Sequence, residues 1–568
     1  MLYFTSMKIF NNKYYKFSIS ELGFNLFLNQ GNKYKLFLKS QVPFILYPEI
    51  SGCSFIPDSW QLIETNNFGI LSWLVHAKMT GSVQINLQNH FYFLDNRLIC
   101  NANYSADKPH NLQGWSIVPK GSKLNCERIH TLSGQHGSDN HENGTWHSPE
   151  IFNFSTASHN WTYVPVAPRI LFYNGKISIL VGGTKISGDY GMEINLKEAE
   201  VESWRFNYGG MEDPLKINAK ENIAGPRLQM QFGNNLIPEH AHKNFNKSLI
   251  NDGLVIEKHY TPEENMWRRP WYCTWGDQMG IAGSALTQDQ GGQPDYSVIK
   301  NVLTQNFVEK AADFIRKNKL NIGTIIIDDG WQDKRGDWNL MKEKFPDMRK
   351  LIDYLHELGF LVVIWWAPFL TEPTAEVLKR KGFTAGPTKK HKEMIINYSN
   401  PEVREWIEEK LELWFGSGPE CWNIDGLKLD FLLEKIYPES QKGDISWRGE
   451  ENAYYHLLKM ITSISRRYKP SSGILHAPYN PMFAQFCTAV HTEERFDKNL
   501  RYFSNRFKLA DIMLPGVWVA PHFNYNPVSV PEAIRRVKKS GGIVQIGRLL
   551  SPDVTPEIIN EIRTLLLP

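Results

Sequence analysis

Two adjacent aspartates end an apolar run near the middle of the chain. Residues 325–338 read IIIDDGWQDKRGDW, so Asp328 and Asp329 follow three isoleucines directly and Trp331 comes two residues later. Burying neighbouring carboxylates is unfavourable unless cations or hydrogen-bond donors meet them. One explanation is a helix cap or a solvated turn. The other is a sugar site, in which carboxylates accept hydrogen bonds from hydroxyl groups and tryptophan stacks on the ring.

A lysine and an aspartate stand two residues apart in a second apolar segment. The segment DGLKLDFL, residues 425–432, contains Lys428 and Asp430. Residues two apart on a strand point to the same face. A lysine beside a carboxylate favours its ionised form, which suits a nucleophile. The alternative is an internal ion pair that only holds the strand in place, but the aromatic Phe431 that follows favours a catalytic role.

A glycosidase needs two carboxyl groups in opposite protonation states. If Asp430 is the ionised one, the segment TAVHTEE at 488–494 offers partners for it: Glu493 and Glu494, with Asp497 just beyond. Neighbouring residues on a strand face opposite sides, so we expect at most one of the two glutamates to face the site. The alternative for each is a surface ion pair with Arg495 or Lys498, and periodicity does not choose among them.

Tryptophans accompany these carboxylates at the ends of several apolar segments. Trp365 and Trp366 end the run FLVVIWWAPF and must alternate faces, so we expect one to face the site. Trp275 and Asp277 follow the segment WYC, and Asp337–Trp338 forms another carboxylate–aromatic pair suited to a sugar.

Strand-like and helix-like segments alternate from about residue 265. Eight strand candidates are separated in several places by amphipathic helical segments; the candidates are 271–276, 322–330, 360–369, 425–432, 473–479, 488–494, 511–521 and 541–547. Repeated βα units with eight strands predict a (β/α)8 TIM barrel, in which catalytic residues sit at the carboxyl ends of the strands. The polar and aromatic residues described above would then share one rim.

The first 255 residues follow a different pattern. Short apolar and aromatic runs alternate with turn residues, and Asn174–Gly175 between RILFY and KISIL is a strong hairpin signal. Helical periodicity is scarce. We therefore predict a multidomain chain, with an antiparallel β-sandwich in residues 1–255 followed by a catalytic barrel in residues 256–568.

The composition is that of an ordinary globular protein. The 568 residues are 42% hydrophobic and carry a net charge of only +3, which gives no reason to expect nucleic acid or an anionic membrane as a partner. The six cysteines contain no C-x-x-C pair, so zinc and thioredoxin-type sites are not indicated. No apolar run is long enough to span a membrane. No secretory signal is visible at the N-terminus, which favours the cytoplasm.

These motifs resemble the retaining α-glycosidases of the α-galactosidase clan, in particular glycoside hydrolase family 36. The resemblance lies in five short motifs: DDGW, the later GDW, K-F-P, the W-x-x-P step that begins at the last residue of LVVIW, and the K-x-D of DGLKLDF. It implies a double displacement in which Asp430 attacks the anomeric carbon and a carboxyl group near 493–497 is the acid/base, without metal or cofactor. It also implies that Asp328, Asp329 and Lys428 hold sugar hydroxyls and that Trp331 and Trp365 shape the subsite. We add Trp275, Glu493 and Arg495 as further candidate sugar contacts.

The sequence departs from that family at two places. Ala367 and Phe369 replace the glutamates usual around the strand-3 proline, and HTEERFD lacks the arginine four residues before an acid/base aspartate. An α-galactosidase-like enzyme acting on an oligosaccharide or other α-glycoside is our expectation. The alternatives are a family 31-like α-glucosidase or α-xylosidase, a raffinose-synthase-like transglycosylase, and a non-catalytic carbohydrate-binding protein on a glycosidase scaffold.

Overall fold

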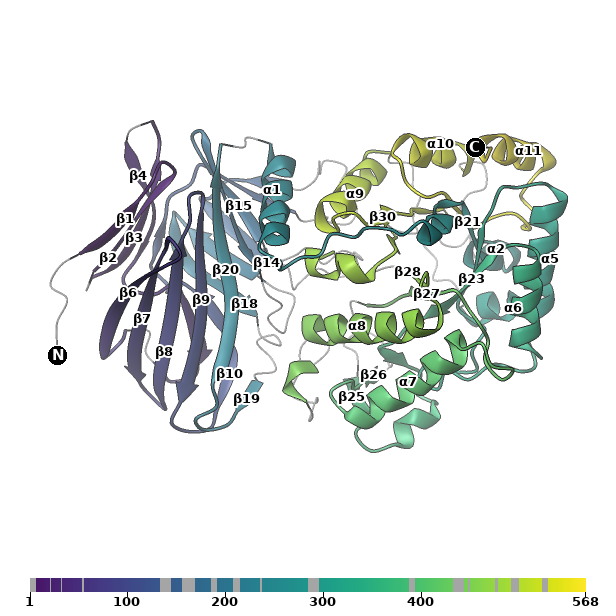
Figure 1. Ribbon diagram of the computed structural model, residues 1–568, viewed down its shortest axis with the longest axis horizontal. Coiled ribbons are helices and arrows are strands. Elements are labelled where there is room, and N and C mark those ends of the chain that lie inside the picture. Colours follow the sequence, from purple (N-terminus) through teal and green to yellow (C-terminus); the bar gives the residue numbers. More distant parts are fainter. Residues whose placement is uncertain are drawn as a thin grey trace. The chain divides into compact units, whose positions relative to one another are not determined.

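The computed structural model forms two compact units. The first comprises Met1–Ile256, Ile436–Ala453 and Tyr479–Met482, and the second comprises Glu257–Lys435, Tyr454–Pro478 and Phe483–Pro568 (Figure 1). The structure describes residues 7–20, 22–31, 33–53, 56–132, 145–155, 169–184, 192–207, 215–234, 237–283, 296–387, 394–432, 444–447, 450–475, 479–491, 500–523 and 530–567.

The first unit consists of two antiparallel sheets that share a core. Phe17 of one sheet packs against Trp73 and Phe91 of the other, with ring centroids 6.0 and 5.4 Å apart. The predicted antiparallel sheets of the N-terminal region are therefore confirmed. One sheet contains β1 (Lys8–Asn11), β2 (Tyr15–Ser20), β3 (Gly23–Asn29), β4 (Tyr34–Ser40), β5 (Leu46–Ile50), β10 (His110–Ile117), β11 (Lys123–Leu124), β14 (Ile151–Ser155), β17 (Met192–Lys197), β18 (Glu200–Asn207) and β19 (Leu215–Ile217). The other contains β6 (Ser59–Asn67), β7 (Ile70–Thr80), β8 (Gln84–Phe93), β9 (Arg97–Ala106), β12 (Arg128–Thr131), β13 (Thr145–His147), β15 (Arg169–Asn174), β16 (Ile177–Gly183) and β20 (Ile223–Gly233).

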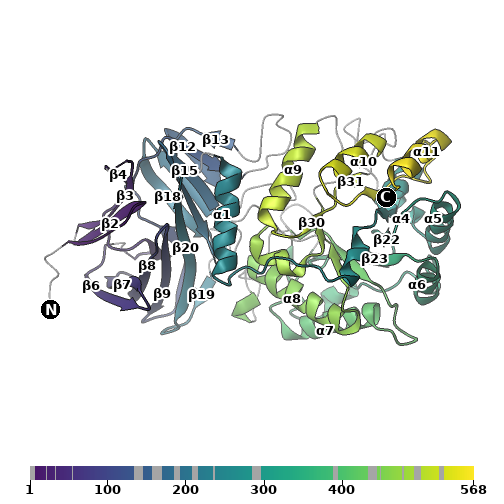
Figure 2. The same cartoon turned by 45° about the horizontal axis from the view of Figure 1, so that its top comes forward.

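The hairpin at Asn174–Gly175 forms as the sequence predicts. β15 and β16 pair in register Asn174↔Ile177, and Gly175 has φ +63°, a value that glycine adopts without the cost other residues meet. A helix that the sequence did not suggest, α1 (Pro238–Asn251), ends the N-terminal half (Figure 2). Its apolar face, with Phe245 and Leu249, packs on Leu171 and Leu180 of β15 and β16.

The second unit is built on a parallel sheet that curls. The order β30-β29-β28-β27-β23-β22-β21-β32-β31 is parallel at every pair, and only two residues separate β30 from β31. Both edges of the sheet thus come from the same short stretch, residues 518–523, as a barrel requires. The strands are β21 (Trp271–Cys273), β22 (Thr324–Ile327), β23 (Leu361–Trp366), β27 (Gly426–Leu429), β28 (Gly473–Leu475), β29 (Ala489–Val490), β30 (Trp518–Val519), β31 (His522–Phe523) and β32 (Gln545–Ile546).

Helices alternate with these strands, and their ends follow local signals. Thr304 caps α5 (Gln305–Lys317) by accepting a hydrogen bond from Phe307 N, which separates this helix from α4 (Tyr296–Val302). Asp347 caps α6 in the same way through Lys350 N. The helices are α2 (Thr274–Ile281), α4 (Tyr296–Val302), α5 (Gln305–Lys317), α6 (Met348–Glu357), α7 (Pro401–Phe415), α8 (Glu450–Tyr468), α9 (Leu500–Met513), α10 (Val530–Lys539) and α11 (Pro556–Leu565). A small antiparallel sheet contains β24 (Leu370–Thr371), β25 (Thr384–Pro387) and β26 (Met394–Ile396).

Two predicted strands are shorter than expected because helices replace their ends. Residues 274–276 begin α2, and residues 511–513 end α9. Both segments are apolar enough to be buried in either conformation, and periodicity does not separate a short buried strand from a buried helical turn.

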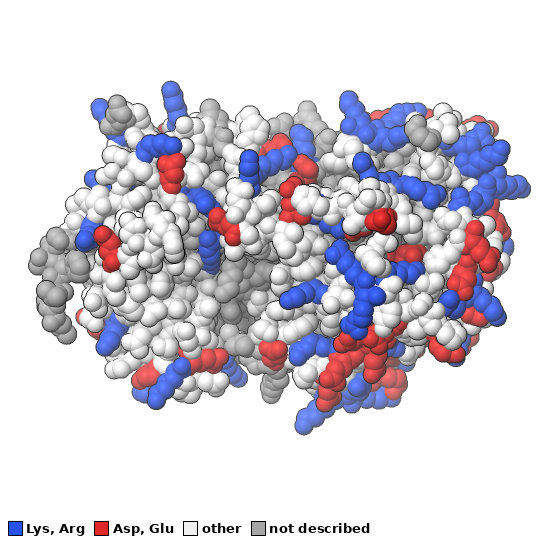
Figure 3. Space-filling model, viewed as in Figure 1, with Lys and Arg blue, Asp and Glu red and all other residues white. Residues whose placement is uncertain are grey.

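The surface carries both signs of charge. Figure 3 shows basic and acidic side chains interspersed over the described part of the face in view, in keeping with the small net charge. Among the described residues, no helix combines the length and the apolar character that crossing a bilayer requires.

Candidate active site

Asp328 answers the question raised by the paired aspartates, because its carboxylate, which follows β22, binds side chains from β21 and β27. Lys428 of β27 donates to its Oδ2 at 2.8 Å, and Cys273 of β21 donates to the same oxygen at 3.1 Å. The Asp329 backbone N–H donates to its Oδ1 at 2.8 Å, and its own N–H donates to Thr274 Oγ1. The carboxylate is thus buried with a cation and donors around it, and the ion pair of Lys428 is made with Asp328.

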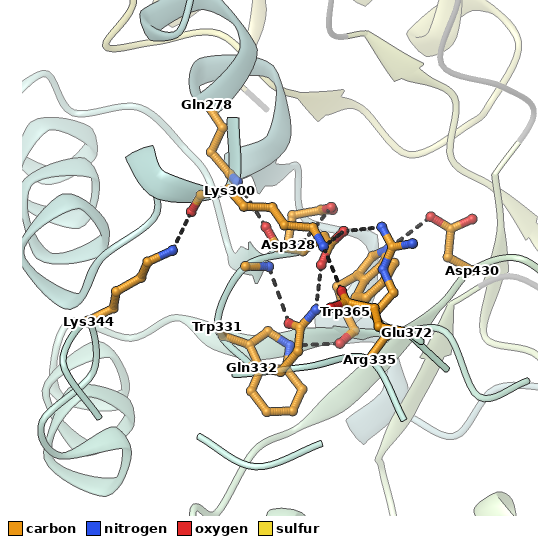
Figure 4. Close-up of polar contacts among 12 residues, drawn as sticks. Gln278, Lys300, Asp328, Trp331, Gln332, Arg335, Lys344, Trp365, Glu372 and Asp430 are labelled. Carbon is orange, nitrogen blue, oxygen red and sulfur yellow. Dashed lines mark hydrogen bonds and ion pairs between the residues drawn. The ribbon is translucent and has the colours of Figure 1, made fainter. Parts of the chain in front are cut away.

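Asp329 is held by a second group of donors. Gln332 Nε2 lies 2.5 Å from Oδ1, Arg335 Nη2 lies 2.6 Å from Oδ2, and Lys300 Nζ lies 3.5 Å from Oδ2 (Figure 4). Glu372 in turn lies 3.3 Å from Lys300. Burial alone would raise the pKa of Asp329, but Arg335 and Lys300 outweigh it and hold that pKa below its usual range.

Asp430 follows β27 and differs from the other two aspartates in its surroundings. It is partly exposed, whereas Asp328 and Asp329 are 2% and 3% exposed. Trp365 Nε1 donates to Oδ2 at 2.8 Å and the Phe431 N–H donates to Oδ1 at 2.8 Å, so a neutral donor meets each oxygen. Phe431 has φ +50°, a strained value for a bulky residue and one found more often at functional sites.

Trp331, which the resemblance gives as shaping the sugar subsite, is buried in this structure. Its side chain is 0% exposed and packs against Trp414 and Trp422 at 5.8 and 5.3 Å between ring centroids. Its Nε1 donates to the backbone oxygen of Trp365. The ring packs inside a cluster of indoles at the strand ends. Burying its apolar surface there stabilises the fold more than leaving it exposed for a sugar would. Trp338 and Trp366 belong to the same buried cluster.

Three further predicted site residues have structural partners. Asp337 accepts hydrogen bonds from Glu376 N and Val377 N, both at 2.8 Å, so it caps a short 3₁₀ helix (Glu376–Lys379). Asp277 accepts from Tyr272 Oη at 2.8 Å and from the backbone that follows β32. Burial raises the pKa of Asp277, and these donors oppose the rise. Trp275 lies in the first turn of α2, 8% exposed, with its ring 6.3 Å from that of Tyr296.

The candidates for the acid/base lie outside the described residues. These are Glu493, Glu494 and Asp497; Arg495, a candidate sugar contact, lies outside the described residues as well, and the described chain before them ends at His491, directly after β29. Within the described ranges, no cluster of three or more His, Cys, Asp or Glu side chains is arranged to hold a metal ion.

Sequence reasoning missed the two cations beside Asp329. Arg335 stands in the quoted stretch itself, six residues after Asp329, and a search of that loop for a counter-ion would have found it. Lys300 comes from α4 and Glu372 follows β24, and only the fold brings Lys300 to Asp329 and Glu372 to Lys300.

Comparison with known proteins places a glycoside hydrolase domain over this site. Residues 294–503 match the model of the glycosyl hydrolases family 31 TIM-barrel domain. The chain is 26% identical over 179 residues to the myogenesis-regulating glycosidase of Mus musculus, covering 29% of this chain and 22% of that protein. It is 26% identical over 171 residues to α-xylosidase XylQ of Lactiplantibacillus pentosus, covering 27% and 21%. The matched segments thus span about a fifth of these relatives.

A solved structure extends the similarity of fold to almost the whole chain. A variant of the family 36 α-galactosidase AgaA from Geobacillus stearothermophilus, in complex with raffinose, superposes with a TM-score of 0.61 at 11% identity. The superposition covers 99% of this chain and 85% of that one. At this identity the likeness concerns the fold. Together, the sequence match and the shared fold support a glycosidase.

Proposed function

We propose that the protein is a retaining α-glycoside hydrolase, most similar in activity to α-galactosidases. In this proposal residues 256–568 close as a (β/α)8 barrel that carries the chemistry, and residues 1–255 form a β-sandwich domain. The substrate is an oligosaccharide or another α-glycoside. The match to a family 31 barrel model and the family 36-like fold both support a mechanism with two carboxyl groups.

The environment of Asp430 carries the proposal. It is a partly exposed carboxylate beside two buried ones, and its two oxygens accept hydrogen bonds from separate donors, Trp365 and Phe431. A nucleophile must present a lone pair in a fixed direction, and these two N–H donors hold the carboxylate in one orientation.

The reaction then follows in two displacements. Asp430 attacks the anomeric carbon and forms a glycosyl ester while the glycosidic bond breaks. A carboxylic acid among Glu493, Glu494 and Asp497 gives its proton to the departing oxygen. The resulting carboxylate next removes a proton from water, which attacks the anomeric carbon and releases Asp430 with net retention of configuration.

Asp328, Asp329 and Lys428 frame the sugar subsite in this proposal, together with Trp365 and Trp275. Glu493 and Arg495 remain proposed contacts next to the acid/base. The fixed ion pairs of the two aspartates make the subsite preorganised, so little rearrangement accompanies binding. A second candidate is an α-xylosidase, because the sequence match over the barrel region includes an enzyme of that name.

The test is turnover of aryl α-galactoside, α-glucoside, α-xyloside and α-N-acetylgalactosaminide by the full chain. We expect one glycoside to be cleaved, with the α-anomer released first, as seen by proton NMR. Asp430→Ala should lose at least about 10⁴-fold in kcat, since a missing nucleophile removes the covalent route. Asp333→Ala, an exposed carboxylate in the loop after Trp331, is the matched control and should keep full activity.

Three outcomes would change the conclusion. Full activity in Asp430→Ala would overturn the nucleophile. Release of the β-anomer first would overturn the retaining mechanism. Absence of turnover on every glycoside, combined with sugar binding measured by calorimetry, would identify a carbohydrate-binding protein on a glycosidase scaffold.

A further inference from the structure

We propose that Arg335 is a positioning residue for the nucleophile, acting by holding the ring of Trp365 so that its indole N–H fixes the Asp430 carboxylate. This inference rests on the proposed function, in which Asp430 attacks the sugar. Figure 4 shows Arg335, Trp365 and Asp430 together.

Arg335 is anchored at one end by Asp329. The Nη2–Oδ2 distance is 2.6 Å, and both side chains are nearly buried, at 11% and 4% exposure. The anchor itself is fixed, because Gln332 donates to the other oxygen of Asp329. A charge-assisted bond of this length in a buried setting leaves the guanidinium little freedom.

The other side of the guanidinium faces two aromatic rings. Its central carbon lies 5.4 Å from the ring centroid of Trp365 and 5.3 Å from that of Phe431. The two rings are nearly perpendicular, at 86° and 6.4 Å between centroids. Both distances fall within the range of cation–π attraction. Arg335 therefore contacts the two residues whose N–H groups meet the oxygens of Asp430.

The indole of Trp365 needs such a support because its backbone alone does not set the ring. Trp331 Nε1 donates to the Trp365 carbonyl and fixes the main chain. The ring plane is set by its neighbours, which include Trp338 at 6.1 Å and Phe431 at 6.4 Å between centroids, and Arg335. A rotation of the ring would move Nε1 away from Asp430, since the donor and acceptor are 2.8 Å apart in the present orientation.

Lysine would not serve in the same way. Arginine is planar and stacks on aromatic rings while its fork binds a carboxylate, whereas an ammonium is a point charge on a flexible stem. Arg335→Lys thus keeps the positive charge beside Asp329 and removes the guanidinium contact with the Trp365 ring. Trp365→Phe keeps a ring in place and removes the N–H donor. Arg335→Lys therefore tests whether Arg335 holds the ring of Trp365, and Trp365→Phe tests whether the indole N–H fixes the Asp430 carboxylate.

The experiment is a double-mutant cycle with Arg335→Lys, Trp365→Phe and the double variant, measured on the glycoside that the parent cleaves. We expect each single variant to lower kcat about tenfold or more with KM within about twofold, because one oriented hydrogen bond to the nucleophile is lost. The double variant should be no slower than Trp365→Phe alone, since Arg335 acts through that ring. The acidic limb of the pH profile of kcat/KM should move to higher pH in all three variants. The reason is that the Trp365 N–H, which favours the ionised form of Asp430, is displaced or removed.

A matched control and a structural readout complete the test. Lys334→Gln alters a half-buried cation next to Arg335 in the chain, whose Nζ donates to Thr374 O, and should leave kcat, KM and the pH profile unchanged. The indole Nε1–H resonance of Trp365, assigned by its loss in Trp365→Phe among the 18 labelled tryptophans, should shift in Arg335→Lys and in Asp430→Asn. The thermal midpoint should fall by no more than a few degrees.

The outcomes that overturn the proposal are distinct from those that overturn the proposed function. Additive losses in the double variant, or a rise in KM alone, would make Arg335 a direct sugar contact. An unchanged indole resonance in Arg335→Lys would remove the coupling to Trp365. If the parent cleaves no glycoside, the proposed function fails, and the NMR measurement still decides whether Arg335 sets the Trp365–Asp430 bond.

Discussion

Lys428 and Asp328 form an ion pair 2.8 Å long in which both side chains are almost fully buried, at 4% and 3% exposure. Lys428 belongs to β27 and Asp328 follows β22, and β23 lies between these two strands in the sheet. The pair thus connects strands that share no backbone hydrogen bonds. Cys273 Sγ beside the same carboxylate brings in β21, and burial raises the pKa of that thiol.

Removing one member of this pair should destabilise the second unit strongly. Asp328→Asn removes the carboxylate charge that lies 2.8 Å from the buried Lys428 ammonium, which costs about 3–5 kcal/mol. Asp328→Asn combined with Lys428→Met should recover much of that loss, because no charge is then left unpaired. Urea unfolding followed by circular dichroism measures both. Losses that simply add in the double variant would show that the two residues stabilise the fold separately.

Trp331→Phe distinguishes a core residue from a sugar contact. The indole is fully buried among other tryptophans and donates one hydrogen bond, so we expect a loss of about 1–3 kcal/mol in unfolding free energy. We expect KM for the cleaved glycoside to stay within about twofold, since the ring offers no surface to the substrate. A tenfold rise in KM without loss of stability would return Trp331 to the subsite.

The alternating strands and helices were predictable because each signal is local. The hairpin at Asn174–Gly175, the cap at Asp347 and the apolar runs of β22, β23 and β27 all depend on a few consecutive residues. The helix α1 was not predicted, because its apolar face is narrow and it follows a long series of strands. Its burial comes from the sheet on which it packs.

The chemistry of the site was only partly predictable for the same reason. Asp328, Asp329 and Asp430 stand out because carboxylates rarely end apolar strands. Their partners are set by the fold: Lys428 is two residues from Asp430 in the chain, yet its ion pair crosses the sheet to Asp328. Periodicity gives the face on which a side chain lies, and it does not give the neighbour that the curl of the sheet brings to that face.

Asp277 should be a main stabiliser of the junction between β21 and β32, which are the first and last strands of the curled sheet in chain order. It comes directly after β21 in α2 and accepts hydrogen bonds from Leu550 N and Ser551 N, which follow β32, at 3.0 and 2.8 Å. Asp277→Ala leaves these buried donors without an acceptor, so we expect a loss of at least about 3 kcal/mol in unfolding free energy. Asp277→Asn keeps one acceptor oxygen and should lose less. Equal losses in the two variants would show that packing, and not hydrogen bonding, determines the effect.

Asp425 should make the stability of the second unit fall in acid. Its carboxylate, just before β27, lies 2.8 Å from His356 Nε2 and 2.6 Å from Lys469 Nζ, and it also accepts from Val362 N at 2.7 Å. Burial alone would raise the pKa of Asp425, but His356 and Lys469 outweigh it and hold that pKa below its usual value. A group whose pKa is lower in the folded than in the unfolded state stabilises the fold at pH values above its unfolded pKa, which is about 3.9 for aspartate. This contribution is lost as the pH falls through the folded-state pKa.

The difference in unfolding free energy between the parent and Asp425→Asn should therefore be largest near neutral pH and shrink below about pH 4. Urea titrations at intervals from pH 3 to pH 7 measure it. Asp353→Asn, which removes an exposed carboxylate paired with Arg349 on α6, is the control and should change stability by less than about 1 kcal/mol at every pH. If the difference in unfolding free energy between the parent and Asp425→Asn stays constant across this range, then the shape of the side chain, and not the charge of the carboxylate, supports β27.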